Sequence, residues 1–164
     1  MIVVLMGVAG AGKTTVGKLF AATLGWEFAD GDDYHSAANI EKMRSGIPLT
    51  DADREPWLNS LRALILKWIE SKKNAVLACS ALKQSYRDYL QANSEVHFVY
   101  LRASEQVLHE RLRARHGHYM TDKMLASQLA TLQEPQHAII VDGDRTPQEI
   151  VAEIRRTLQQ ATKA

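Results

Sequence analysis

Short apolar runs alternate along the chain with longer segments whose apolar residues recur at helical spacing. The apolar runs predict five strands, at residues 2–6, 26–29, 75–79, 96–101 and 138–141. Strands that alternate with helices in this way are typical of a parallel sheet with helices on both faces. We therefore expect a single α/β domain over residues 1–164, with a five-stranded parallel sheet as the middle of three layers.

The clearest helix signals lie in the middle and at the end of the chain. Apolar residues repeat at helical spacing over residues 57–69, with Asp53 predicted as the N-cap and a proline in the first turn. Two tryptophans on this helix are expected in the core or an interface, and a base-stacking platform is the alternative. The last helix is predicted to begin with Thr146 as N-cap, Pro147 at the first helical position and Glu149 as a capping glutamate.

A phosphate-binding motif lies between the first strand and the first helix. Residues 7–14 read Gly-Val-Ala-Gly-Ala-Gly-Lys-Thr, the P-loop pattern G-x-x-x-x-G-K-T, and Gly25 closes the helix that follows. The backbone N–H groups of such a loop cradle phosphates, while Lys13 supplies charge to the β- and γ-phosphates and the Thr14 hydroxyl ligates Mg²⁺. We therefore predict binding of ATP and Mg²⁺, with nucleotide contacts from Gly7, Val8, Ala9, Gly10, Ala11, Gly12, Lys13, Thr14 and Thr15.

Composition narrows the class of protein further. The formal net charge is +1 and the basic residues are scattered, which does not favour nucleic acid as a partner. The single cysteine, Cys79, has no internal disulfide partner, and the run before the P-loop is too short for a signal peptide or a membrane span. We expect a cytoplasmic protein that binds no membrane.

Acidic residues gather where the second predicted strand ends. Asp30, Asp32 and Asp33 fall within four positions, and ligands of open α/β sheets bind beyond the carboxyl ends of the strands. Beside a Mg-nucleotide loop, these carboxylates have a metal to approach and a hydroxyl to deprotonate. An acidic, solvated turn is the alternative. The third strand lacks the terminal aspartate of a Walker-B motif, so metal support is assigned to Thr14 and the carboxylates of the second strand.

Two basic pairs are candidates for anion binding. Lys83 and Arg87 lie four residues apart, where an anionic ligand would relieve their repulsion, although Asp88 or water would do so too. Arg111 and Arg115 share a helical face on a segment that contains a glycine, which suits neutralisation of the γ-phosphoryl group as a site closes. We therefore predict catalytic roles for Arg111 and Arg115, together with Lys13 and Asp32.

The ordered motifs resemble those of the gluconokinases, the small ATP-dependent gluconate kinases. Besides the P-loop, the resemblance rests on residues 30–35, 39–43, 46–51, 53–58, 79–83, 86–88, 127–128, 131–132 and 134–135. This chain departs from the usual family pattern at Tyr34, Ser36 and Tyr119, and these changes are conservative. The resemblance implies a P-loop fold like that of nucleoside-monophosphate kinases, with a substrate-binding flap over about residues 33–56 and a lid over about residues 111–122.

The resemblance also implies an activity and a set of substrate contacts. Gluconokinases transfer the γ-phosphoryl group of ATP to the 6-hydroxyl of D-gluconate and are commonly homodimers. By this resemblance, Asp30 supports Mg²⁺ through water and Asp32 orients the acceptor hydroxyl. His35 is placed in the substrate site, and Arg54, Lys83 and Arg87 are candidates for the gluconate carboxylate. A kinase of the same fold acting on shikimate or a nucleoside monophosphate, and a non-catalytic nucleotide-binding module, are the alternatives.

Overall fold

The computed structural model describes residues 1–115 and 122–161, which form the predicted five-stranded parallel sheet. The strands have the order β2-β3-β1-β4-β5, and every pairing is parallel. They are β1 (Ile2–Met6), β2 (Glu27–Asp30), β3 (Ala75–Ala78), β4 (Val96–Arg102) and β5 (Ile139–Asp142). Each predicted strand is thus present, with ends shifted by no more than one residue.

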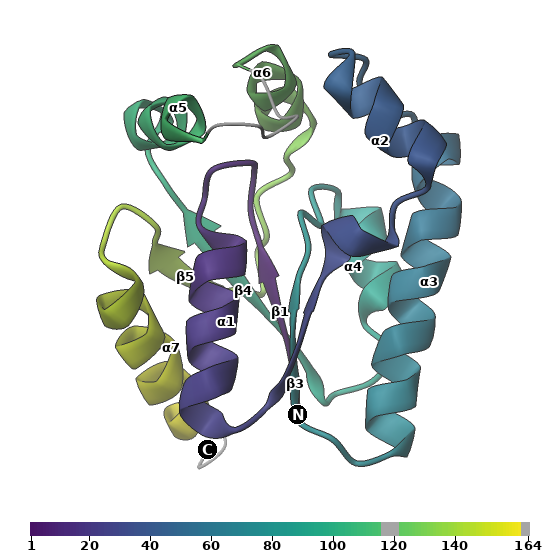
Figure 1. The fold of residues 1–164 in the computed structure, drawn as a ribbon. Coiled ribbons are helices and arrows are strands. Elements are labelled where there is room, and N and C mark those ends of the chain that lie inside the picture. The colour runs from purple at the N-terminus through teal and green to yellow at the C-terminus, as the bar shows by residue number, and fades with distance from the viewer. Residues whose placement is uncertain (116–121, 162–164) are drawn as a thin grey trace.

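Helices cover both faces of this sheet, so the three-layer prediction is confirmed. Helices α1 (Lys13–Leu24) and α7 (Pro147–Ala161) lie on one face, and α3 (Asp51–Glu70) and α4 (Gln84–Leu90) on the other (Figure 1). The remaining helical segments lie toward the carboxyl end of the strands. They are the short 3₁₀ helix η1 (Gly31–Tyr34), α2 (Ala37–Arg44), α5 (Glu105–Ala114) and α6 (Asp122–Thr131).

The central strand β1 divides the apolar core into two parts. Its five residues have no exposed surface, and successive side chains point to opposite faces of the sheet. Val3 and Leu5 belong to the core under α1 and α7, whereas Ile2, Val4 and Met6 belong to the core under α3 and α4. A strand covered on both faces is apolar throughout, which explains why the sequence shows a run here and no alternation.

Helix α3 begins earlier than the sequence pattern predicts. Its N-cap is Thr50, whose hydroxyl accepts a hydrogen bond from the Asp53 N–H at 3.1 Å, while the Asp53 carboxylate accepts from the Thr50 N–H at 2.9 Å. The prediction of Asp53 as N-cap was therefore wrong, because Asp53 is the third residue of a capping box. The prediction for α7 is confirmed, since Thr146 and Glu149 form the same reciprocal pair of bonds.

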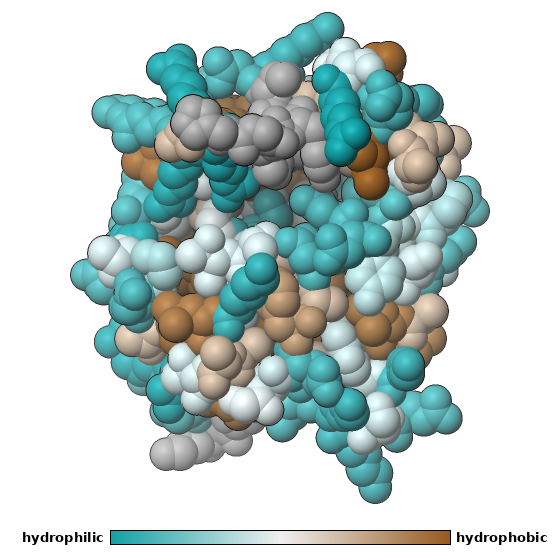
Figure 2. Space-filling view, in the orientation of Figure 1, coloured by the Kyte–Doolittle hydropathy of each residue, from teal (hydrophilic) through white to brown (hydrophobic). Residues whose placement is uncertain are grey.

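Hydrophilic side chains cover much of the molecular face drawn in Figure 2, and hydrophobic residues appear there in separate patches. Among the described residues, no helix combines the length and the apolar character needed to cross a bilayer.

The two tryptophans of α3 are buried, with Trp57 3% and Trp68 7% exposed, as expected for core residues.

Candidate active site

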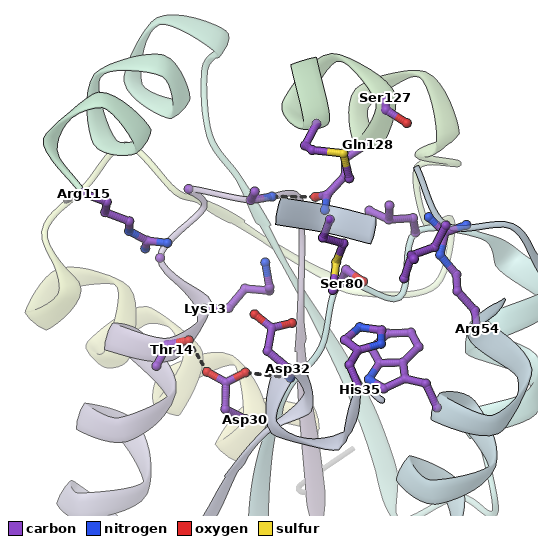
Figure 3. A pocket seen from close by; sticks show the side chains of 18 of the residues that line it. Lys13, Thr14, Asp30, Asp32, His35, Arg54, Ser80, Arg115, Ser127 and Gln128 are labelled. Atoms are coloured by element: carbon purple, nitrogen blue, oxygen red, sulfur yellow. Dashed lines mark hydrogen bonds between the residues drawn. The ribbon is translucent and has the colours of Figure 1, made fainter. Parts of the chain in front are cut away.

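A cavity of about 350 Å³ opens at the carboxyl edge of the sheet, where the P-loop faces the flap (Figure 3). Its walls come from the P-loop, the turn after β2, helices α2 and α3, the loop after β3, and α6. The lining residues are Ala9, Gly10, Gly12, Lys13, Thr14, Thr15, Asp30, Asp32, His35, Met43, Leu49, Arg54, Trp57, Ser80, Leu82, Arg115, Met124, Ser127 and Gln128. The topology therefore brings the predicted phosphate loop and the predicted acidic cluster to one site.

The P-loop requires glycine at its turning points. Gly10 and Gly12 have φ values of 85° and 94°, in the left-handed region that disfavours other residues. A Cβ atom on Gly10 would also lie 3.1 Å from the Leu108 carbonyl oxygen, since α5 packs closely behind the loop. Gly12 leads directly into α1, so the loop ends at a helix N-terminus, where backbone N–H groups and the helix dipole favour an anion.

Lys13 is a partly buried cation of this site. Its ammonium donates to the Val8 carbonyl oxygen at 3.0 Å, which holds the side chain back over the loop. Burial lowers the pKa of Lys13 below its ordinary value, and the nearby charges of Asp32 and Asp30 oppose that effect. Figure 3 shows the Asp32 carboxylate directed toward Lys13. A polyphosphate bound in the loop would bring negative charge next to this ammonium.

Thr14 and Asp30 form the predicted metal-supporting pair. The Thr14 hydroxyl donates to Asp30 Oδ2 at 2.5 Å, and the Asp32 N–H donates to the other oxygen of Asp30 at 3.0 Å. The described residues contain no group of three metal-ligating side chains. This donor set fits Mg²⁺, which takes few protein ligands and completes its coordination shell with water and substrate phosphates.

An aromatic wall faces the acidic turn. His35 stacks on Trp57 with ring centroids 4.4 Å apart and an interplanar angle of 10°. The Trp57 indole N–H donates to the Gly31 carbonyl oxygen at 2.7 Å, which fixes the start of η1 relative to α3. Burial, together with the positive charge of Arg54, lowers the pKa of His35 to about 4. His35 is therefore neutral near pH 7.

Of the three basic residues predicted to hold a sugar-acid carboxylate, only Arg54 is among the described residues that line the cavity. Its guanidinium donates to the Tyr86 hydroxyl at 3.2 Å and lies over the Tyr86 ring. Lys83 forms an ion pair with Asp51 at 2.8 Å, and this hydrogen bond raises the pKa of Lys83. Arg87 is buried against backbone carbonyl groups, so the prediction that Lys83 and Arg87 face an anionic ligand is not supported by their positions.

Of the two arginines predicted to share a catalytic face, one lines this cavity, among the residues that the structure describes. Arg115, at the end of α5, lines the cavity and extends toward the P-loop in Figure 3. Arg111 instead donates to the carbonyl oxygens of Gly10, Ala11 and Gly143 at 3.2, 3.3 and 2.8 Å, and thus braces the loop from behind. Arg111 and Arg115 both line a second cavity of about 300 Å³ beside the P-loop. Half of the predicted lid, residues 116–121, lies outside the described residues.

Several lining residues were not assigned from the sequence. Ser80 follows β3, while Ser127 and Gln128 lie on α6. Gln128 accepts a hydrogen bond from the Ala9 N–H at 2.7 Å and thereby joins α6 to the P-loop. The 119 positions between these partners leave no local pattern to predict their contact. Ser127 and Gln128 entered the sequence analysis only as part of a family motif.

Comparisons with known proteins agree on one family. The family model for shikimate kinase matches residues 9–159. A gluconokinase from Gluconobacter oxydans (strain 621H) is 44% identical over 160 residues, which cover 95% of this chain and 90% of that protein. The crystal structure of a gluconokinase from Sinorhizobium meliloti 1021 is 42% identical, with a TM-score of 0.87 and coverage of 98% and 93%. The shikimate kinase of Aquifex aeolicus vf5, at 20% identity and a TM-score of 0.67, shares the fold.

The fold and the site define a P-loop kinase of small molecules, in which the phosphate loop and the residues after β2 line one cavity. The chain belongs to the shikimate kinase family and, within it, to the gluconokinases.

Proposed function

We propose that the protein transfers the γ-phosphoryl group of ATP to the 6-hydroxyl of D-gluconate, giving 6-phospho-D-gluconate and ADP. The observation that carries this proposal is a single cavity with Lys13 and Asp32 at one end and Arg54 at the other. A linear sugar acid has a hydroxyl for the first end and a carboxylate for the second. The gluconokinase relatives, at 44% and 42% identity, support this choice of acceptor.

Asp32 is the residue proposed to act on the acceptor hydroxyl. A primary alcohol is a poor nucleophile, and a carboxylate within hydrogen-bond reach orients it and takes its proton as the phosphoryl group transfers. Lys13 lies next to Asp32 and neutralises charge on the β- and γ-phosphates. Arg115 reaches the same cavity and is proposed to add positive charge on the opposite side. Arg111 supports the loop through its backbone carbonyl groups and is proposed to act without touching the γ-phosphoryl group.

The remaining polar groups suit the hydroxyls of the acceptor. Ser80, Ser127 and Gln128 line the cavity, and the stacked rings of His35 and Trp57 form one wall. Neutral His35 offers one donor and one acceptor, which fits a sugar hydroxyl better than an anion. Arg54 is the proposed partner of the carboxylate, because a guanidinium binds a carboxylate with two parallel hydrogen bonds.

Mg²⁺ is proposed to bind with ATP beside Thr14 and Asp30, where it would neutralise phosphate charge. Asp30 is held by the Thr14 hydroxyl and the Asp32 N–H, so its carboxylate is oriented before any ligand arrives. The second cavity adjoins Gly12 and Thr15 at the other side of the loop and is proposed to receive the base of the nucleotide.

A screen of acceptors tests the proposed function. ADP release, coupled to a spectroscopic readout, would be measured with ATP and Mg²⁺ across gluconate, other aldonic acids, shikimate and nucleoside monophosphates. We expect kcat/KM to be highest for gluconate, with phosphate found on its 6-hydroxyl by NMR. A higher kcat/KM for another acceptor would reassign the substrate, and no ADP release with any of them would favour a nucleotide-binding module.

The proposed assembly rests on the family resemblance, and the proposed location and partners rest on the single cysteine and the scattered charges of the sequence. We propose a homodimer located in the cytoplasm, with no nucleic acid or membrane partner. Light scattering coupled to gel filtration would test the assembly, with an expected mass of twice the 18.4 kDa of one chain.

A further inference from the structure

We propose that Arg87 is a positioning residue for the acceptor site. It fixes the loop that presents Ser80 to the cavity, and it sets the affinity for the acceptor without touching it. This inference rests on the proposed function, because it concerns the gluconate end of the same cavity. The first observation that supports the inference is the set of hydrogen bonds made by the Arg87 guanidinium.

All the N–H donors of the Arg87 guanidinium form hydrogen bonds inside the protein. Nη1 donates to the carbonyl oxygens of Ala81 and Leu82 at 2.8 and 3.1 Å. Nη2 donates to the Gln133 carbonyl oxygen at 2.7 Å and to Gln84 Oε1 at 2.8 Å, and Nε donates to the same oxygen at 3.3 Å. These bonds use all five N–H donors of a guanidinium. The residue is 3% exposed, so no donor remains for a ligand.

The loop held by Arg87 has an unusual backbone. Ala81 has a φ of 45°, in the left-handed region that residues with a Cβ atom rarely adopt. Its side chain is fully buried, so it cannot relax toward solvent. A conformation of this kind persists only where surrounding contacts determine it. The bonds from Arg87 to the Ala81 and Leu82 carbonyl oxygens supply such contacts.

The same loop reaches both halves of the active site. Ser80 lines the cavity, and its carbonyl oxygen accepts a hydrogen bond from the Gly7 N–H at 3.3 Å. On the other side, Leu82 accepts from the Gln133 N–H at 2.8 Å, which joins the loop to the segment after α6. A shift of the Ala81 and Leu82 carbonyl groups would therefore move Ser80. Gly7 is only the first residue of the P-loop, so the phosphate-binding turn at residues 10–15 is expected to move less.

A lysine at position 87 would keep the charge and lose the geometry. Its ammonium has three donors around one nitrogen, whereas the three carbonyl groups and Gln84 lie around a planar fork. We expect Arg87→Lys to raise the KM for gluconate about tenfold or more while the KM for ATP stays within twofold. Arg62→Lys is the matched control, because Arg62 also donates to a backbone carbonyl, that of Tyr89 at the far end of α4. It should leave both constants unchanged.

Two further measurements separate positioning from general loss of stability. Guanidinium ion added to Arg87→Ala should lower the raised gluconate KM of that variant part of the way to the parent value. It should not change the gluconate KM of Arg62→Ala. In a double-mutant cycle, Arg87→Lys and Ser80→Ala should be non-additive in their effect on kcat/KM for gluconate, because both act through one side chain. Additive effects would overturn the assignment to Ser80.

The variant Gln84→Met tests the proposal if the Arg87 variants do not fold. It keeps Arg87 and removes the amide oxygen that orients the guanidinium, together with the exposed bond from Gln84 Nε2 to Asp88, and it should raise the gluconate KM by a smaller factor. Unchanged gluconate KM in Arg87→Lys or Gln84→Met, with only the melting temperature lowered, would overturn the proposal. So would a proportional rise in the KM for ATP. If the parent protein does not use gluconate, the proposed function fails instead, and the comparison is made with the acceptor that the screen identifies.

Discussion

Lys13 carries a positive charge in a partly buried position beside the P-loop. Burial disfavours that charge, and the neighbouring carboxylates of Asp30 and Asp32 favour it. The ammonium donates a hydrogen bond to one backbone carbonyl oxygen, that of Val8. ATP would replace this neutral acceptor with phosphate oxygens, so the lysine contributes more to the bound nucleotide than to the fold.

Lys13→Ala is therefore expected to remove phosphoryl transfer and leave the protein folded. We expect kcat to fall by about 10²–10³-fold or more, the range found when a single preorganised electrostatic group is removed. Steady-state turnover measured beside thermal unfolding tests this. Lys18→Ala, which alters an exposed lysine on the same helix, is the control. Turnover within tenfold of the parent in folded protein would contradict the role of Lys13.

Asp32 and Asp30 are expected to separate into two kinetic roles. Asp32→Asn keeps the shape and loses the charge, so kcat should fall by about 10²–10⁴-fold with near-parental ATP binding. Asp30→Asn should instead raise the Mg²⁺ concentration needed for half-maximal activity. Titrations of each variant with ATP and Mg²⁺ test the division. Asp33→Asn is the matched control, since Asp33 follows in the same turn and lines a different surface depression.

If Asp32→Asn failed mainly in its Mg²⁺ requirement, the two roles would be exchanged. Equal losses in Asp32→Asn and Asp33→Asn would point to the net charge of the turn and away from a specific base.

The neutral state of His35 predicts a pH dependence of stability. Its pKa is about 4 in the folded protein, through burial and the charge of Arg54, and about 6.5 in an unfolded chain. Between these values the unfolded state binds more protons, so the free energy of unfolding rises with pH. The contribution is fully present above about pH 6.5 and is lost as the pH falls toward 4.

His35→Phe keeps the stack on Trp57 and cannot titrate. The free energy of unfolding falls when the pH is lowered from 7 to 4.5. We expect this fall to be smaller in the variant than in the parent, by roughly 1–2 kcal/mol. Urea unfolding at both pH values measures this difference. The exposed His137→Phe is the control and should follow the parent. Parallel behaviour of all three proteins would show that His35 does not control this transition.

Single residues also show where sequence reasoning ends. The P-loop and the acidic turn were predicted correctly as parts of one site, because their chemistry is encoded in adjacent positions at strand ends. Lys83 and Arg87 were assigned from charge and spacing, but Lys83 is paired with the distant Asp51, and Arg87 binds backbone carbonyl groups whose direction the sequence does not show. Charge alone does not tell whether an arginine faces a ligand or a backbone.

The segment from α2 to α3 is held together at one helix start. The side-chain amide of Asn39 donates to the Asp53 carbonyl oxygen at 2.8 Å, and Lys42 binds both carboxylate oxygens of Asp53 at 2.9 and 3.0 Å. The capping box with Thr50 and the link to Lys42 lower the pKa of Asp53 to about 2. The flap is thus joined to the long helix that carries Arg54 and Trp57.

Thr50→Ala is expected to weaken this helix start. Loss of an N-cap hydroxyl costs about 0.5–2 kcal/mol, which corresponds to a fall in melting temperature of about 2–4 °C per kcal/mol for a domain of this size. Ser60→Ala, in the interior of α3, is the control and should change stability by less than about 0.5 kcal/mol. Calorimetry of both variants checks the difference, and equal melting temperatures would show that the cap does not stabilise α3.

The elements themselves were largely predictable, and their ends were less so. The strands follow from apolar runs because both faces of the sheet are covered, and α7 follows from its capping residues. The start of α3 was misplaced by three residues, since Thr50 and Asp53 are both good N-caps and only the backbone decides between them. The cavity wall from α6 had no local signal at all, because Gln128 meets Ala9 only after the chain has folded.

The molecule as a whole should respond to its two ligands through one folding equilibrium. A ligand that binds only the folded state at 100 times its dissociation constant stabilises it by about 2.7 kcal/mol. For a domain of this size, that predicts a rise in melting temperature of about 5–10 °C with a non-hydrolysable ATP analogue and Mg²⁺. Differential scanning fluorimetry tests this, with Lys13→Ala as the variant that should respond least. An equal shift in that variant would place the nucleotide elsewhere.

The acceptor side of the site and the phosphate loop come from different segments of the chain. Asp32, His35, Arg54 and Trp57 all belong to the stretch between β2 and β3, whereas the phosphate loop lies between β1 and α1. One continuous piece of chain thus carries the residues proposed to orient the acceptor hydroxyl and to bind the acceptor carboxylate. A duplicated gene could acquire a new substrate by changing that piece alone and inherit its use of ATP intact. Within the family, we expect sequence divergence between kinases of different acceptors to concentrate there.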